Sequence, residues 1–230
     1  MRVNIHNVKF DKSNIAKGIA ALVFCLVTFG SGYWVAQHEL ETREKLRGEL
    51  INRDPRKRVA ALKKVAKGEF HPPTPMLMRR MTDEHHFVSG TAAETIYRMG
   101  LGKKLTSVVV ANLMERLPKE PEFTKRWLIA NIVVVDYEAG FELAAQHLPK
   151  MNSRWSKPFF VRILTLHAEK DGNAQKVLTE MLQRDERYSD LAKLVQAKLA
   201  MPEKRRWRSN TDFLPPTLLV KKVPPLATDL

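Results

Sequence analysis

The chain has 230 residues, a net charge of +14 and a pI near 10.0. Hydrophobic residues make up 44% and charged residues 28%, as in ordinary folded proteins, which argues against a wholly disordered chain. The single cysteine excludes a disulfide within the chain. The excess of lysine and arginine indicates an anionic neighbour, such as an acidic subunit, lipid headgroups or nucleic acid.

Residues 1–17 form a basic polar lead, and residues 18–36 after it contain no charged side chain. At about 1.5 Å per residue, a helix of this length spans roughly 28 Å, close to the hydrocarbon thickness of a bilayer. Tyr33 and Trp34 lie at one end, where aromatic side chains prefer the headgroup level. We therefore predict a single transmembrane helix. A cleaved signal peptide is the alternative, but the apolar stretch is long for one and no Ala-x-Ala site follows.

Small side chains recur along this helix at steps of three and four residues, so they share one face. Such residues let two backbones approach closely, which is how helices associate within a bilayer. We expect this face to pack against the transmembrane helix of a partner subunit or of a second copy of the chain. Its residues are Gly18, Ala21, Cys25, Thr28, Gly32 and Ala36. The basic residues flanking the helix favour an N-terminus on the inside, with the rest of the chain on the opposite side.

Residues 37–53 are predicted to continue as a helical stalk, because they contain no proline and place Glu39, Arg43 and Arg47 at four-residue spacing. A run of short helices is then predicted over residues 54–200. The first begins with Asp54-Pro55, an N-cap followed by proline at the first helical position, and ends at Gly68. The others are expected from residue 74 and over 83–99, 104–117, 122–138, 141–148, 153–170, 174–183 and 188–200.

The valine run at residues 133–135 could form a buried strand, but its helical surroundings and the lack of a second strand pattern favour a helix. Gly68, Gly100, Gly140 and Gly172 are each predicted to end a helix. Their spacings of 32, 40 and 32 residues lie within the range of helical repeats.

The segment 54–68 resembles the second helix of a HEAT or HEAT-like repeat, and residues 89–96 echo it. The resemblance is carried by Arg58, Ala60, Ala61, Leu62 and Val65. It implies an all-α fold in which residues 54–200 form an α-solenoid of degenerate repeats. A TPR-like solenoid is the alternative. It ranks second because the Trp, Gly-Tyr and Pro positions of that repeat do not recur in register here.

Residues 201–230 differ in composition from the predicted helices. A basic cluster comes first: Lys204, Arg205, Arg206, Trp207 and Arg208. We expect it to contact an acidic partner subunit or anionic lipid, with nucleic acid disfavoured because no recognition fold is visible; a solvated charge run is the alternative. Two proline pairs then favour an extended tail. Its apolar residues should lie on a partner or on the chain's own domain: Phe213, Leu214, Leu218, Leu219, Val220 and Leu226.

No catalytic motif, haem attachment sequence or metal-ligand spacing is found, so we expect a protein that is not an enzyme and holds no cofactor or metal. His85 and His86 are adjacent and cannot chelate as an i,i+4 pair would, and His147 and His167 are expected at the surface or at helix caps. The sequence therefore suggests a single-pass membrane accessory or scaffold subunit of a larger complex, with respiratory and photosynthetic complexes as one setting. The alternative is a membrane-anchored adaptor, homodimeric or not, that recruits a soluble protein or binds anionic lipid.

Overall fold

The computed structural model describes residues 37–202, which contain helices and no strand, so the predicted all-α fold is confirmed for this part of the chain. Residues 37–48 and residues 49–202 belong to two separate compact units. Residues 37–48 are helical, and within them Arg43 forms an ion pair with Glu39 at 2.6 Å, one helical turn away.

The second unit consists of short helices joined by tight connections. The α-helices are α2 (Pro55–Ala66), α3 (Thr74–Met81), α4 (His86–Arg98), α5 (Ser107–Arg116), α6 (Glu122–Val135), α7 (Tyr137–His147), α8 (Ser156–Ala168), α9 (Gly172–Met181) and α10 (Glu186–Leu199). Three 3₁₀ turns lie between them: η1 (Gly102–Lys104), η2 (Leu117–Lys119) and η3 (Leu148–Lys150). The valine run at residues 133–135 lies within α6, as predicted.

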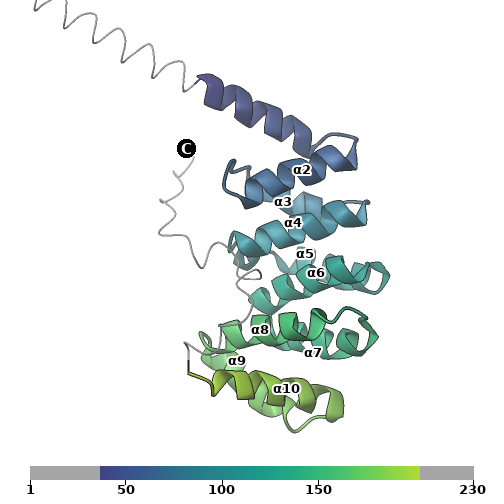
Figure 1. The fold of residues 1–230 in the computed structure, drawn as a ribbon, viewed down its shortest axis with the longest axis vertical. Coiled ribbons are helices and arrows are strands. Elements are labelled where there is room, and N and C mark those ends of the chain that lie inside the picture. The colour runs from purple at the N-terminus through teal and green to yellow at the C-terminus, as the bar shows by residue number, and fades with distance from the viewer. Residues whose placement is uncertain (1–36, 203–230) are drawn as a thin grey trace, which may run out of the picture. The chain divides into compact units, whose positions relative to one another are not determined.

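The even-numbered helices form a stack in which α2 packs on α4, α4 on α6, α6 on α8 and α8 on α10. Figure 1 shows this order from blue to yellow. The odd-numbered helices fill the spaces beside the stack: α3 packs on α4, α7 on α6, and α9 on both α8 and α10. Fully buried apolar side chains, including Leu62, Ile96, Leu128 and Phe160, form the core along this row.

Local chemistry explains where several helices begin and end. Asp54, Asp136 and Asp185 are N-caps whose side chains accept a hydrogen bond from a backbone N–H of the first turn. Gly68 and Gly100 follow α2 and α4 with φ of 78° and 69°, a left-handed conformation that favours glycine. Both helices therefore end in the predicted glycine turns.

Gly140 and Gly172 do not end helices, so that prediction is wrong for both. Gly140 lies inside α7, and a Cβ added there would be 2.6 Å from the Val133 Cα, so glycine permits a close approach between α6 and α7. The chain breaks earlier, at Asp136, which closes α6 and caps α7. Gly172 is the first residue of α9. Of the predicted spacings, only the 32 residues from Gly68 to Gly100 therefore separate two helix ends.

Other helix boundaries differ from the prediction by a few residues. The largest difference is at the start of α7, at Tyr137 rather than residue 141, and α4 starts at His86 rather than residue 83. Asp83 lies before α4, and its carboxylate accepts hydrogen bonds from Arg58 and Arg80, both at 2.8 Å. The same carboxylate accepts a hydrogen bond from the backbone N–H of His85 at 3.1 Å, so Asp83 contacts the start of α4 from outside the helix.

The ion pairs around Asp83 join α2, α3 and the start of α4. The side chains of Arg58 and Asp83 are only 6% and 3% exposed. Arg116 extends the cluster by donating to the Asp83 carbonyl oxygen at 2.9 Å and to the Glu120 carboxylate at 2.7 Å. Glu120 also contacts the His86 ring nitrogen at 2.7 Å. Buried charges of this kind hold their partners in fixed geometry, because an unpaired charge in the interior is costly.

Candidate functional site

The predicted site residues all lie outside the part of the chain that the structure describes. This applies to the small-residue face at 18–36, to the basic cluster at 204–208 and to the apolar tail positions from Phe213 onward. They stay predictions. Among residues 37–202, no helix is both long enough and apolar enough to span a bilayer. In the same residues, no three histidine, cysteine or acidic side chains lie close enough together to hold a metal ion.

The described residues do bring together a group that the sequence analysis did not identify. Aromatic rings from three successive helices of the even-numbered row contact one another. The Tyr97 ring of α4 lies 5.7 Å from Trp127 of α6, and Trp127 lies 4.9 Å from Phe159 of α8 in an edge-to-face arrangement. Such pairs add stabilisation beyond the apolar area that they bury. We call Tyr97, Arg98, Arg126, Trp127, Arg154, Trp155, Phe159 and Arg162 the arginine–aromatic strip.

The arginines of the strip lie over its aromatic rings. The Cζ atom of Arg98 is 5.7 Å from the Trp127 ring centroid, and that of Arg126 is 5.8 Å from the Phe159 centroid. At these distances the guanidinium is attracted by the negative face of the ring. The Nε atoms of both arginines are buried without a hydrogen-bond partner. Burial lowers the pKa of Arg126, while the negative charges of Glu122 and Glu94 act in the opposite direction.

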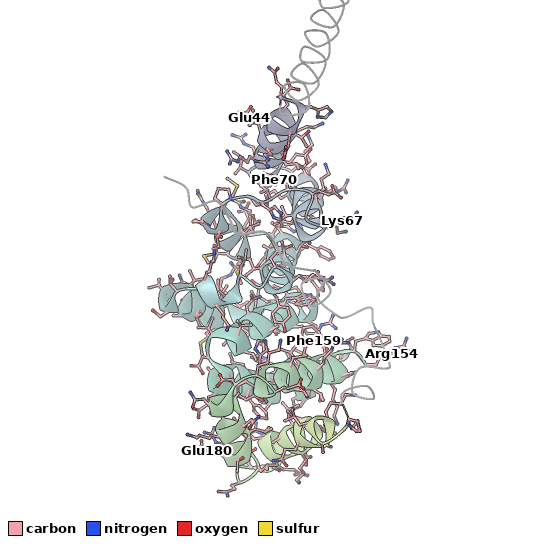
Figure 2. The ribbon with its side chains drawn as sticks, turned by 90° about the vertical axis from the view of Figure 1, so that its left-hand side faces the viewer. Glu44, Lys67, Phe70, Arg154, Phe159 and Glu180 are labelled. Carbon is pink, nitrogen blue, oxygen red and sulfur yellow. The ribbon has the colours of Figure 1, made fainter. Side chains whose placement is uncertain are left out.

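The strip continues to the start of α8, where Arg154 lies 4.9 Å from the centroid of the neighbouring Trp155 ring. Trp155 is 39% exposed. Glu122 of α6 fixes this segment by accepting hydrogen bonds from the backbone N–H groups of Asn152 and Ser153 and from the Ser156 hydroxyl. Figure 2 shows Arg154 and Phe159 on the same side of the domain. The exposed end of the strip is thus held by an acidic residue of the adjacent helix.

Histidine and tyrosine at the strip have strongly perturbed pKa values. Burial, followed by the charges of Lys170 and Lys103, lowers the pKa of His167 to about 4, so its ring is neutral near pH 7. Its Nε2 atom lies 3.4 Å from the Tyr97 hydroxyl. Burial raises the pKa of Tyr97, against the nearby charge of Arg162. His167, which the sequence analysis expected at the surface or at a helix cap, is half-buried in the last turn of α8, with its ring centroid 6.3 Å from that of Tyr97.

Of the other histidines, His86 pairs with Glu120, and His85 occupies the N-cap position of α4 without a side-chain cap bond. Burial and the charges of Lys125 and Lys150 lower the pKa of His147. As at His167, the nearby positive charges belong to lysines. The surroundings of His147 therefore favour anions over cations.

A sequence signal for the strip existed. Adjacent arginine and aromatic residues recur as Tyr97-Arg98, Arg126-Trp127 and Arg154-Trp155, at a spacing of roughly 29 residues that falls within the range of helical repeats. In the sequence alone these pairs look like three unrelated dipeptides, because nothing there shows that α4, α6 and α8 are neighbours. The structure places them along one row.

The described residues define an all-α domain in which arginines lie over buried aromatic rings, and this strip is exposed to solvent at Arg154 and Trp155. No family model, curated protein or solved structure matches the chain.

Proposed function

We propose that the protein is a single-pass membrane accessory or scaffold subunit that helps to assemble or stabilise a larger membrane complex. Residues 18–36 would anchor it, residues 54–200 would form a HEAT-like helical-repeat platform, and the basic cluster and tail after residue 200 would contact a neighbouring subunit. The protein acts by binding and carries out no reaction of its own.

The observation that carries this proposal is the arginine–aromatic strip. Arginine, tryptophan and tyrosine are the residues most enriched where protein interfaces gain their binding energy. Here Arg154 and Trp155 are exposed at one end of the strip, and the Nε of Arg126 makes no hydrogen bond among the described residues. An acidic segment of a partner subunit would supply carboxylates to these guanidinium groups, which bind them in a planar, bidentate geometry.

The anchor is supported by the sequence of residues 18–36. An uncharged stretch of bilayer length, bordered by Tyr33 and Trp34, is typical of a membrane-spanning helix. The small residues on one side, such as Gly32, favour helix docking inside the membrane. A partner held at two places, in the membrane and on the strip, would be bound far more tightly than at either alone.

A second candidate, binding to an anionic lipid surface, is favoured by α2. Its exposed charged side chains, Arg56, Lys57 and Lys63, are all positive, and no acidic residue lies within the helix. Basic residues close to a membrane gain roughly 1 kcal/mol each from anionic headgroups. Lipid binding would orient the domain against the bilayer and is compatible with either an accessory subunit or an adaptor.

The experiment is a mild-detergent purification of the full chain with a C-terminal tag, compared with two variants of the anchor. Gly32→Leu adds bulk to the small-residue face, and Val27→Leu, away from that face, is the matched control. We expect membrane proteins in stoichiometric amounts with the wild type and with Val27→Leu, and their loss with Gly32→Leu. A chain that purifies alone or as a homodimer would reject the accessory-subunit proposal and favour the adaptor.

A further inference from the structure

The last two helices, with the end of α8, enclose a shallow groove of about 520 Å³. Leu178 of α9 and Leu199 and Ala200 at the end of α10 supply apolar lining, and Gln175 and Gln196 supply amides. Glu169, just after α8, is the one charged side chain among the residues that line it. The groove is therefore suited to a ligand that is partly apolar and positively charged.

The chain itself carries such a segment immediately beyond the groove. The described part ends at Pro202, two residues after Ala200, and the basic cluster Lys204 to Arg208 follows. An extended chain covers at most about 3.6 Å per residue, so Trp207 cannot lie further than roughly 25 Å from Ala200. A short tether of this kind keeps the segment at an effective local concentration on the order of millimolar. No external ligand of similar chemistry competes easily with a segment held so close.

The chemistry of the two partners is complementary. Trp207 has a large apolar ring with one N–H donor, which suits a groove lined by both leucine and amide side chains. The four positive residues around Trp207 are complementary to the negative charge that Glu169 contributes to the lining of the groove. Two more acidic residues, Asp171 and Glu180, are exposed on or beside α9. Figure 2 shows Glu180 at the lower end of the domain, on the side away from Arg154.

We propose that residues 203–208 fold back onto the groove of α9 and α10, with Trp207 in the groove and the basic side chains at Glu169. The tail from residue 209 then leaves the domain from a fixed position, and its apolar residues are presented to a neighbouring surface instead of being held on a free chain. This inference concerns contacts within one chain and does not depend on the membrane function proposed above. It assigns the basic cluster to the chain's own groove and leaves the contact with a neighbouring subunit to the tail after residue 208.

The test is cross-linking of paired cysteines in the full chain, with Cys25→Ser removing the native thiol. One variant combines Thr179→Cys, in the groove, with Arg208→Cys. The control combines Ala197→Cys with Arg208→Cys; Ala197 is exposed, does not line the groove and lies closer to the tail along the chain. A short bismaleimide is added, and the intramolecular product is quantified by peptide mass spectrometry. Circular dichroism of both variants verifies the helical fold.

A free tail would react faster with Ala197→Cys, because shorter loops close at a smaller entropic cost. A docked tail reverses the order, and we expect the Thr179→Cys pair to react about tenfold faster than the control. Adding Trp207→Ala or Glu169→Lys should remove that preference. Equal or faster reaction of the control pair overturns the proposal, as does a preference that survives both added substitutions.

Discussion

Arginines at the two ends of the described domain are used in different ways. At the first end, Arg58 and Arg80 bind an Asp83 carboxylate whose side chain is 3% exposed. At the last end, Arg184 bonds to Glu138 and Glu142 with side chains between 35% and 47% exposed. Buried pairs are costly to break, whereas exposed pairs contribute little. At the first end, arginine therefore holds α2, α3 and α4 together through buried ion pairs. Near α10, arginine forms only exposed ion pairs, which contribute little to stability.

The largest expected effect comes from removing the acid of the buried cluster. Asp83→Ala leaves the guanidinium groups of Arg58 and Arg80 without their carboxylate in a buried site, so we expect the free energy of unfolding to fall by about 3–5 kcal/mol. Urea denaturation followed by circular dichroism measures this. The control is Asp190→Ala, which removes an exposed ion pair with Lys193 on α10. Similar losses in the two variants would refute the contrast between the two ends.

Protonation of His167 provides a second comparison, within the central stack. Its pKa is about 4 in the folded chain, below the ordinary value of 6.5, so burial favours the neutral ring. The unfolded chain binds the extra proton between these values, and folded stability is therefore full above pH 6.5 and falls as the pH drops toward 4. The loss attributable to this ring is up to about 3 kcal/mol.

His167→Gln should flatten that part of the pH dependence while retaining a polar partner for Tyr97. Denaturation midpoints of both proteins at several pH values between 7 and 4 measure the slopes. The two proteins differ only at residue 167, so the difference between their slopes isolates the histidine. Identical slopes would show that the ring titrates at its ordinary pKa.

A smaller effect is expected where α6 and α7 meet. Gly140→Ala places a Cβ 2.6 Å from backbone atoms of Val133, so the two helices must separate, at a cost of about 1–3 kcal/mol. Gly172→Ala is the matched control, because nothing lies within 4 Å of its added Cβ and alanine favours a helix. Thermal denaturation should show a lower midpoint for the first variant and an unchanged or higher one for the second. The opposite order would contradict the close packing.

The smallest effect is expected at the exposed arginine of the last end. Arg184→Ala removes contacts with two acidic residues of α7, but water solvates all three groups. We expect no measurable change in the denaturation midpoint. A drop comparable with that of Asp83→Ala would mean that the two ends are held by the same kind of interaction.

Local signals in the sequence were sufficient for much of the fold. Aspartate at residue 54 and glycine at residues 68 and 100 act through their own backbone conformation, so their roles could be predicted without neighbours. Gly140 could not be assigned in the same way, since its role depends on the distance between two helices. Asp83 is a similar case: its partner Arg58 lies 25 residues away, and only the fold brings the two together.

The candidate site depended even more on the fold. The residues of the strip come together only because α4, α6 and α8 are stacked in that order. The recurrence of arginine–aromatic pairs is visible in the sequence, but only the packing of the helices shows that these pairs lie together. The predicted sites at residues 18–36 and 204–226 lie outside the described residues, so their roles are tested by the substitutions and cross-links in those segments.

The most direct measurement concerns the strip as the partner-binding surface. Arg126→Glu combined with Arg154→Glu reverses two charges on it, and Arg79→Glu combined with Arg187→Glu makes the same change in net charge at exposed positions elsewhere. Each full-length variant is purified in mild detergent, and the stoichiometry of co-purifying membrane subunits is measured. The account predicts that the strip variant loses the partner while the control keeps it. Retention by the strip variant, or equal loss from both, would contradict it.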